Sequence, residues 1–400
     1  ELYKIGRSAN DQSLYSEYAR LQEQEALQRQ YGEAGSTPLK LACRDGDVVS
    51  LQRLLLQAAE EEEQVASAFL VACDYAQEHC CGALFDRVTD TQTLTAGLRR
   101  CVNPKSDFSL TVHDRQRDTI VRQLLSRDSA VNLGSESFAI DRALFCSSVN
   151  GFAGCTKLLL SAKANVNATD KDTTRTPLWL AAFSGQRACL EVLLAAKADV
   201  ELGGGSDGMS ATFIGAQQGH LRVLQLLIDA KADITRPRRI DGATPTMQAA
   251  QNGHVAAVQL LVRVKANVDR HSTAGYTPTT LAALNGHSQV LQVLVNAKAE
   301  VNRRHSGTGK TAALFASEGG HHRALDFLIH AKANVNTPSN RGKTPAHAAA
   351  QHGSVKVMRL LIAAKADLNR KYRHRTPRAW ASKKNHSKVV QLLIEAKARP

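Results

Sequence analysis

Residues 176–200 read TPLWLAAFSGQRACLEVLLAAKADV, and this arrangement decides the fold because it returns along the chain. In each copy a Thr or Ser comes first, a Gly (Asn385 in the last copy) follows nine residues later, and a Lys follows twelve residues after that. The opening residue recurs at Thr176, Ser210, Thr244, Thr277, Thr311, Thr344 and Thr376. The Lys recurs at Lys197, Lys231, Lys265, Lys298, Lys332, Lys365 and Lys397. A period near 33 residues predicts a stack of similar supersecondary units rather than one closed core.

Each recurring residue has a physical reason to stand where it does. Thr before Pro, as at Thr176-Pro177, starts a helix because the hydroxyl caps free N–H groups and Pro fits the first turn. Gly185 and its equivalents are expected to end that helix in the left-handed conformation. Asn385 replaces Gly in the last copy and is the next best residue there. A second helix with Leu, Val and Ile at helical spacing is predicted to end at Ala-Lys-Ala.

The pattern closely resembles the ankyrin repeat. Thr344-Pro345-Ala346-His347 is close to the Thr-Pro-Leu-His element of that family, and Gly219-His220 and Gly253-His254 match its Gly-His element. The resemblance implies an all-α ankyrin-repeat solenoid of about 10–11 helix-turn-helix repeats with projecting inter-repeat loops. It also implies a non-catalytic scaffold or adaptor for protein–protein recognition.

Two features depart from the family pattern. Where the family usually has Gly after the second helix, this chain has Lys in every copy, beginning with Lys163. If that position is left-handed here as well, each Lys costs about 1 kcal/mol relative to Gly. A cation at a helix C-terminus returns roughly 0.3–1 kcal/mol of this through the helix dipole. The His of the first element is mostly replaced, so its inter-repeat hydrogen bonds are not carried over to these repeats; the replacements are Trp179, Phe213, Met247, Thr280 and Leu314.

The N-terminal part of the chain follows the repeat less closely. Residues 1–34 are polar, and we predict a helical cap or linker there, with a docking helix as the alternative. Residues 35–134 are predicted to hold a first repeat, opened by Thr37, and then two degenerate repeats. Helices are expected over residues 65–77, 81–88 and 118–125, and an inserted element around residues 89–113 is the alternative. Residues 135–400 are predicted to form the regular array.

Charge is distributed unevenly along the chain. Residues 204–400 carry 29 Lys and Arg against 10 Asp and Glu, whereas residues 1–203 carry 22 against 27. Such a reversal indicates that one end of the molecule meets an acidic partner, although a solvated, charged surface that keeps a long array soluble explains it as well. No apolar run approaches the ~20 residues that a membrane span needs.

The sequence predicts no catalytic centre, no cofactor and no metal site. The eight Cys include no Cys-x-x-Cys pair, and neither a nucleophile elbow nor a His-Glu-x-x-His motif is present. We therefore interpret the Cys as reduced thiols of an intracellular protein, which is cytoplasmic or nuclear. No small-molecule substrate is expected. A monomer is expected.

Basic residues gather in the inter-repeat loops, which project along one edge of an ankyrin stack. We predict that they form a basic ridge suited to carboxylates or phosphates. The ridge residues are Arg236, Arg238, Arg239, Arg270, Arg303, Arg304, Arg341, Arg370, Lys371, Arg373 and Arg375.

The resemblance also places a concave groove along the residues just before each Gly. The groove residues are Phe183, Gln217, Gln251, Leu284 and Gln351. Uncharged amides in the middle of this row suit an extended peptide better than a deep small-molecule pocket. We expect a protein partner whose acidic or extended segment lies on the groove and the ridge.

Two other functions remain open from the sequence. The ridge is also suited to nucleic acid or to an anionic surface, although the scarcity of aromatic residues in the loops argues against base stacking. The chain is alternatively the targeting arm of a larger enzyme.

Overall fold

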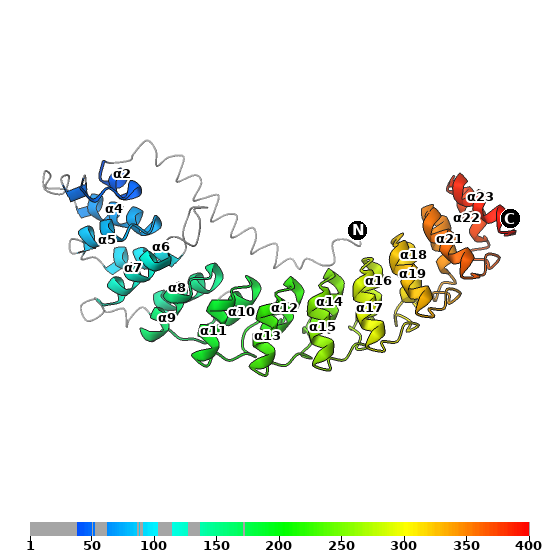
Figure 1. Cartoon of the computed structure of the whole chain (residues 1–400), viewed down its shortest axis with the longest axis horizontal. Helices are drawn as coiled ribbons and strands as arrows, with labels where there is room; N and C mark the ends of the chain where they lie inside the picture. The colour runs from blue at the N-terminus through cyan, green and yellow to red at the C-terminus, as the bar shows by residue number, and fades with distance from the viewer. Residues whose placement is uncertain are drawn as a thin grey trace. The chain divides into compact units, whose positions relative to one another are not determined.

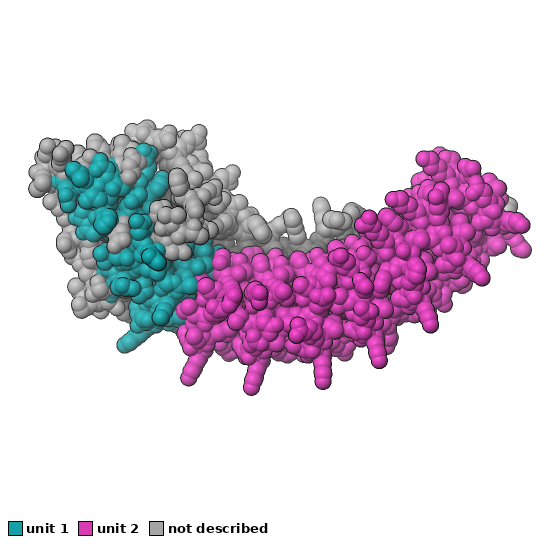
Figure 2. All heavy atoms as spheres, in the orientation of Figure 1, with its two compact units in different colours: residues 1–165 teal, residues 166–400 magenta. Residues whose placement is uncertain are grey.

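A computed structural model describes residues 38–49, 51–52, 62–85, 88, 91–102, 114–126, 137–170 and 173–399. The predicted N-terminal cap over residues 1–34 lies outside these residues. Within them the chain is helical, and the extended pairing consists of a single bridge between Tyr372 and Arg375. No described helix is both long and apolar enough to span a membrane. The chain divides into two compact units, residues 1–165 and 166–400 (Figure 2).

The first unit consists of paired helices. Its helices are α2 (Pro38–Asp45), α4 (Glu62–Asp74), α5 (Glu78–Phe85), α6 (Thr91–Val102), α7 (Asp114–Ser126), α8 (Ser137–Asn150) and α9 (Ala153–Ser161). Contacts run in two rows, α2 to α4 to α6 to α8 and α5 to α7 to α9. Each first helix therefore packs on the first helix of the next pair, and each second helix on the next second helix.

Helix α6 lies in a stretch for which the sequence analysis named no helix. Leu94, Leu98, Cys101 and Val102 are buried at positions separated by four, three and one residues, which is the spacing of one helical face. The apolar stripe is short and is flanked by Arg and Thr, so it was not recognised beside the stronger repeats. In the structure α6 and α7 form a pair of the same kind as their neighbours.

The second unit is a regular array of seven helix pairs (Figure 1). The first helices are α10 (Pro177–Phe183), α12 (Ala211–Gln218), α14 (Pro245–Asn252), α16 (Pro278–Leu284), α18 (Ala312–Glu318), α20 (Pro345–His352) and α22 (Pro377–Lys383). The second helices are α11 (Arg187–Ala195), α13 (Leu221–Asp229), α15 (Val255–Arg263), α17 (Ser288–Asn296), α19 (His322–His330), α21 (Val355–Ala363) and α23 (Ser387–Glu395). Small residues such as Ala249 and Ala250 allow the first helices to approach closely, and Leu residues such as Leu261 and Leu294 fill the space between the two rows.

The first helices begin and end as predicted. The Thr176 hydroxyl accepts a hydrogen bond from the N–H of Trp179 (3.2 Å), and Ser210 accepts one from Phe213 (3.1 Å). The helix ends at a left-handed Gly, such as Gly219 with φ 76°, and Asn385 takes the same conformation with φ 59°. The opening hydroxyl and the closing Gly therefore fix the two ends of a two-turn helix.

The Lys that follows the second helix is left-handed in each of the eight helix pairs from α8 and α9 to α22 and α23. We call the seven in the second unit the end lysines; they are Lys197, Lys231, Lys265, Lys298, Lys332, Lys365 and Lys397, with φ between 55° and 64°. Lys163 in the first unit has φ 67°. The conditional cost predicted from sequence therefore applies to each of them, at about 1 kcal/mol relative to Gly, and the helix dipole offsets only part of it.

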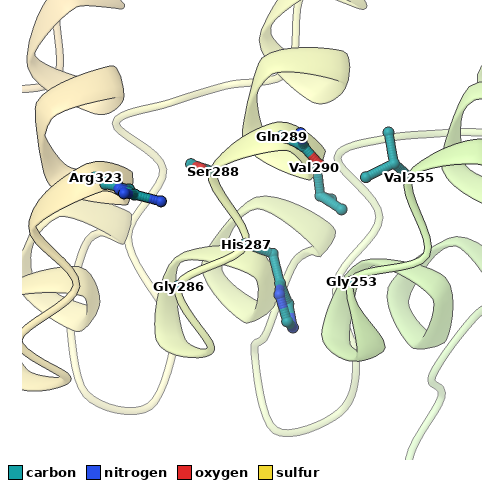
Figure 3. A pocket seen from close by; sticks show the side chains of 8 residues that line it. All are labelled: Gly253, Val255, Gly286, His287, Ser288, Gln289, Val290 and Arg323. Carbon is teal, nitrogen blue, oxygen red and sulfur yellow. The ribbon is translucent and has the colours of Figure 1, made fainter.

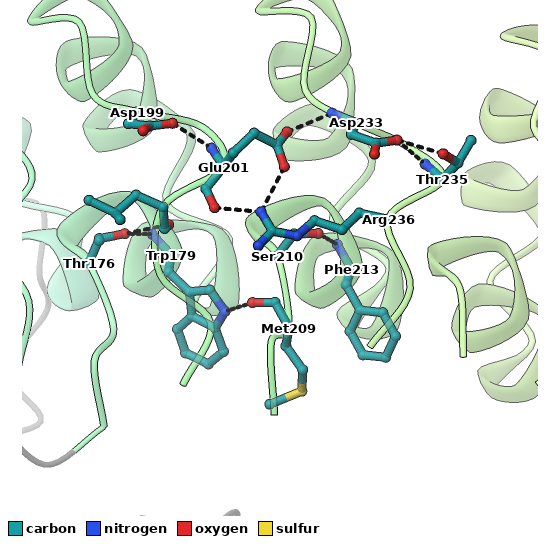
Figure 4. A network of polar contacts seen from close by, with 11 residues as sticks. Thr176, Trp179, Asp199, Glu201, Met209, Ser210, Phe213, Asp233, Thr235 and Arg236 are labelled. Atoms are coloured by element: carbon teal, nitrogen blue, oxygen red, sulfur yellow. Dashed lines mark hydrogen bonds and ion pairs between the residues drawn. The ribbon is translucent and has the colours of Figure 1, made fainter. Parts of the chain in front are cut away.

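Side chains of one repeat form hydrogen bonds with the backbone of the next repeat (Figure 4). The Glu201 carboxylate accepts a hydrogen bond from the N–H of Asp233 in the next repeat (2.7 Å), and Asn302 accepts one from Asn334 (2.7 Å). The same bond joins Asn336 to Asp367 and Asn369 to Arg399. The Asn and Asp that follow Ala-Lys-Ala therefore link neighbouring repeats through the backbone.

The left-handed Lys gives a stability prediction. Replacing Lys265 by Gly should raise the free energy of unfolding by up to about 1 kcal/mol, because the left-handed backbone no longer carries a Cβ. Urea denaturation followed by far-UV circular dichroism measures the change. Arg359→Gly, at an exposed position inside α21, is the matched control and should destabilise by about 1 kcal/mol. A loss of stability in Lys265→Gly would show that the Lys side chain contributes more than its backbone costs.

Candidate partner-binding surface

Several of the predicted ridge arginines make contacts inside the protein. The Arg238 guanidinium donates two hydrogen bonds to the Asp241 carboxylate, one of them at 2.9 Å, and lies over the Phe213 ring at 5.4 Å. Arg236 donates to the Glu201 carboxylate (3.0 Å) and to its backbone carbonyl (2.6 Å). These two side chains hold their loops against the preceding repeat, so their charge is already compensated.

Arg304 joins two consecutive loops. Its guanidinium donates to the carbonyls of Gly309 (3.1 Å) and Pro338 (3.3 Å) and to the side-chain oxygen of Asn340 (2.9 Å). Neighbouring Arg303 is half-buried and lies 3.7 Å from the Glu300 carboxylate. Arg304 therefore acts as a clip between the loops of two repeats, although its side chain remains reachable from solvent.

The remaining ridge residues are exposed. Within residues 173–399 the guanidinium groups of Arg239 and Arg341 form no hydrogen bond or ion pair, and Arg270 makes one long bond to the carbonyl of Thr235 (3.5 Å). In the last loop, Arg373 lies over the Tyr372 ring at 5.5 Å and Arg375 over the Trp380 ring at 5.4 Å. We call this set the loop-tip cations; it comprises Arg239, Arg270, Arg341, Arg370, Lys371, Arg373 and Arg375.

The predicted groove residues form one row along the first helices. Each ends or nearly ends its helix, and its backbone carbonyl accepts a hydrogen bond from a His at the start of the second helix in the next repeat. The bonds join His220 to Phe183 (3.1 Å), His254 to Gln217 (2.9 Å), His287 to Gln251 (3.0 Å), His321 to Leu284 (2.9 Å) and His386 to Gln351 (3.1 Å). The backbone carbonyls of the row are therefore hydrogen-bonded within the array, and the side chains of the row are partly exposed.

The same His rings explain a second role of the Gly before them. A Cβ on Gly253 would lie 2.7 Å from the His287 ring, and one on Gly219 would lie 2.5 Å from the His254 ring. Figure 3 shows His287 between Gly286 and Gly253, on one side of a hollow of about 340 Å³ that Arg323 lines on the other side. Gly is therefore required at these turns both for its left-handed backbone and for the space that the next repeat's His fills. Burial lowers the pKa of His287, which keeps the ring neutral.

A charged group interrupts the row at Glu318. Its two carboxylate oxygens accept hydrogen bonds from Lys310 (2.7 Å) and from Lys343 of the next repeat (2.9 Å). Burial works to raise the pKa of Glu318, but the bonds and charges of the two lysines outweigh it and hold the pKa below its ordinary value. Ser354 stands in the following repeat at the position that holds His in five repeats and Gln186 in the first repeat of the second unit. The sequence analysis did not identify this network, which the two lysines one repeat apart could have indicated.

The sequence analysis did not carry the family's first-element His bonds over to Trp179, and the structure provides a different bond there. The Trp179 indole N–H donates to the carbonyl of Met209 in the next repeat at 2.8 Å (Figure 4). The Thr280 hydroxyl does not make a bond of this kind. It forms a capping box with Thr277 instead. The one His retained at this position, His347, is fully buried, and its Nδ1 accepts a hydrogen bond from the N–H of Thr344 (3.3 Å). Burial, aided by the charges of Lys343 and Arg370, lowers the pKa of His347 to about 4.

Comparison with known proteins identifies the repeat. The sequence profile described as ankyrin repeats (3 copies) matches residues 110–203, 206–305 and 306–400, which together are most of the chain. Among solved structures, the human ASB11 ankyrin repeat domain matches with a TM-score of 0.52 and 24% identity, over 56% of this chain and 100% of that one. At this identity the likeness concerns the fold. The search of curated proteins gives no match. In the described part of the chain, no group of three or more His, Cys, Asp or Glu is placed to hold a metal ion.

The division of the ridge arginines predicts different effects on stability. Arg304→Ala should lower the free energy of unfolding by about 1–2 kcal/mol, because it removes three hydrogen bonds that link two loops. Arg341→Ala, the matched exposed arginine, should change stability by less than about 0.5 kcal/mol. Thermal and urea denaturation of the two variants measure this. Equal effects would contradict the assignment of Arg304 as a clip.

Buried His347 predicts a pH dependence of stability. Its pKa in the folded chain, about 4, lies below the ordinary 6.5, so the unfolded chain binds the proton more readily. Stability is therefore complete above about pH 6.5 and is lost as the pH falls toward 4, by about 2 kcal/mol at pH 5. His347→Thr, which introduces the residue found at the equivalent Thr280, should reduce this loss in urea denaturation at pH 7 and pH 5. An unchanged pH slope in the variant would assign the loss to other groups.

Proposed function

Because the chain belongs to the ankyrin-repeat family, whose members are generally protein-interaction modules, we propose that it is a non-catalytic scaffold that captures an acidic, extended segment of a protein partner. The contact surface consists of the loop-tip cations and of the row from Phe183 to Gln351. The observation that carries the proposal is that the loop-tip cations of the second unit are exposed and form no ion pair with a carboxylate within residues 173–399.

The chemistry of the loop tips favours carboxylates. Six of the seven loop-tip cations are Arg, whose planar guanidinium binds a carboxylate through two parallel hydrogen bonds. They stand on loops that repeat at the spacing of packed helices, roughly 8–10 Å. An extended chain with acidic residues at intervals matches such a series better than a compact ligand does, and the excess of positive charge in residues 204–400 accelerates the encounter.

The first-helix row adds a second, uncharged contact. The side chains of Phe183, Gln217, Gln251, Leu284 and Gln351 are partly exposed on consecutive repeats, and their carbonyls are occupied by the His of the following repeat. The amide groups of Gln251 and Gln351 are therefore the hydrogen-bonding groups that the row offers to the backbone of a bound peptide, whereas the Gln217 side-chain oxygen is buried.

Nucleic acid is a less suitable ligand for this surface. The two Tyr of the basic loops are occupied inside the fold: Tyr276 packs against His305 (4.4 Å between ring centroids) and Phe315 (5.8 Å), and Tyr372 against Trp380 (5.9 Å). Single-stranded nucleic acid gains much of its affinity from bases stacked on free aromatic rings. The alternative that the chain is the targeting arm of a larger enzyme would use the same peptide-binding surface. It differs from the proposal only in the protein to which this surface is joined.

Peptide selection tests the proposal. A displayed library of random 16-residue peptides, selected on the intact chain, should enrich sequences rich in Asp and Glu. A variant with Gln in place of all seven loop-tip cations should bind the selected peptides at least tenfold more weakly, because each exposed charge pair contributes about 0.2–1 kcal/mol. Binding is measured by fluorescence anisotropy at fixed ionic strength.

The matched control removes the same number of charges elsewhere. A variant with Asn in place of the seven end lysines has the same net charge as the loop-tip variant and should keep peptide affinity within about threefold. Enrichment of neutral or basic peptides, or an equal loss in the two variants, would overturn the proposal.

A further inference from the structure

The end lysines form a second basic surface that the proposed peptide contact does not use. All seven are exposed, and each follows the last turn of a second helix, from α11 to α23. The backbone places them identically, because each Lys N–H bonds to a carbonyl of that last turn, as in Lys197 to Leu194 (2.9 Å) and Lys298 to Val295 (2.8 Å). Seven identical turns on stacked helices place seven ammonium groups in one row.

The ammonium groups of this row have no partner in the array. Across residues 173–399, no end lysine forms an ion pair or a side-chain hydrogen bond. In several repeats an Asp stands two residues after the end lysine, but its carboxylate binds backbone N–H groups. Asp199 accepts from the N–H of Glu201 (2.9 Å) and Asp367 from the N–H of Asn369 (2.9 Å). The row is therefore positively charged without compensation by these neighbours.

Backbone conformation does not explain the choice of Lys. At the end of the first helix, the chain meets the same left-handed requirement with Gly, as in Gly219, Gly253 and Gly286. At the end of the second helix, in every pair from α8 and α9 onward, it uses Lys, at the backbone cost derived above. The charge, rather than the turn, is the property that all these positions share.

The surroundings of the row leave the ammonium groups free to approach a surface. Both neighbours of each Lys in the chain are Ala, except at Lys265, which follows Val264. Figure 2 shows side chains that project at regular intervals from the edge of the second unit where, in Figure 1, the second helices end. Apart from Val264, no chain neighbour of an end lysine is larger than Ala or offers an apolar anchor.

From this row we infer a peripheral binding surface for an anionic lipid bilayer. An ammonium is a compact point charge that needs no fixed geometry of acceptors, unlike the fork of Arg. Lipid headgroups diffuse laterally and adopt any spacing, so a row with the pitch of packed helices, roughly 8–10 Å, finds a phosphate or carboxylate under each Lys that reaches the leaflet. That pitch equals or exceeds the screening length of about 8 Å at physiological salt, so the lysines repel one another little. Several lysines near an anionic leaflet act together in the way that polybasic segments do.

A nucleic acid fits this row less well. A fixed lattice of phosphates does not adjust to the pitch of the repeats, and the Ala residues beside the lysines provide no ring on which a base stacks. Duplex DNA and single-stranded RNA are therefore the competitors to be included in the test.

The experiment measures sedimentation of the full chain with sucrose-loaded vesicles. One set of vesicles contains phosphatidylcholine alone. In the other set roughly 30 mol% of the phosphatidylcholine is replaced by phosphatidylserine, to imitate an anionic leaflet. The end-lysine variant (Lys→Asn at all seven positions) tests the row, and the loop-tip variant removes the same charge from the loops. Asn tolerates the left-handed backbone, so the end-lysine variant should fold at least as stably as the wild type, which thermal denaturation checks.

We expect binding to the anionic vesicles, none to the neutral ones, and a loss of at least tenfold in the end-lysine variant. The loop-tip variant should lose less than about threefold, because its charges lie outside the row. The inference is overturned by absent binding to anionic vesicles, by an equal loss in the two variants, or by competition in which duplex DNA or RNA displaces the chain at equal phosphate concentration. The peptide assay uses the same two variants with the opposite expectation, so failure of the bilayer inference and failure of the peptide proposal are distinguishable.

Discussion

Hydrogen bonds from the side chains of one repeat to the backbone of its neighbour are the constraint on which this array depends. In five of the repeats a His binds a backbone carbonyl near the end of the preceding first helix, as His287 does at Gln251. A polar side chain also binds the backbone N–H two residues after the next end lysine, as Asn302 does at Asn334. A two-helix unit cannot bury its own apolar face, and these bonds fix how the next unit covers it. The array therefore gains its order from one interface repeated at a constant register.

The same constraint decides which charges are available for partners. Arg236 and Arg304 lie in the basic loops but bind groups of the preceding or following loop, and Arg238 binds Asp241 of its own loop, whereas Arg239 and Arg341 are exposed. At Glu318, two lysines that sequence alone would count as free are bound to one carboxylate. A basic loop in a repeat protein thus contains two populations of cations, and only the exposed one contributes to recognition.

How far the sequence predicted the structure follows from the range of the interactions concerned. The Thr that begins each first helix, the Gly or Asn385 that ends it and the left-handed turn at Lys265 depend on residues within one repeat, and all could be predicted. Helix α6 was missed because its short apolar stripe is recognisable only once α4 and α8 are seen to cover it. The partners of Arg304 and Trp179 lie about 30 residues away in the next loop, where the side-chain geometry depends on loop conformation. No pattern within a single repeat carries that information.

The end lysines show what sequence and structure contribute together. From the sequence, Lys at a position where the family has Gly is a departure with a conditional energetic cost. The structure makes that cost real, since Lys298 and its equivalents are all left-handed, and it removes the common compensation, since no carboxylate of the described array pairs with them. A residue that is unfavourable for the backbone, unpaired and repeated at every equivalent position is better explained by what it meets outside the fold than by the fold itself. The second helices thus end in a basic row that is chemically distinct from the arginines of the loops.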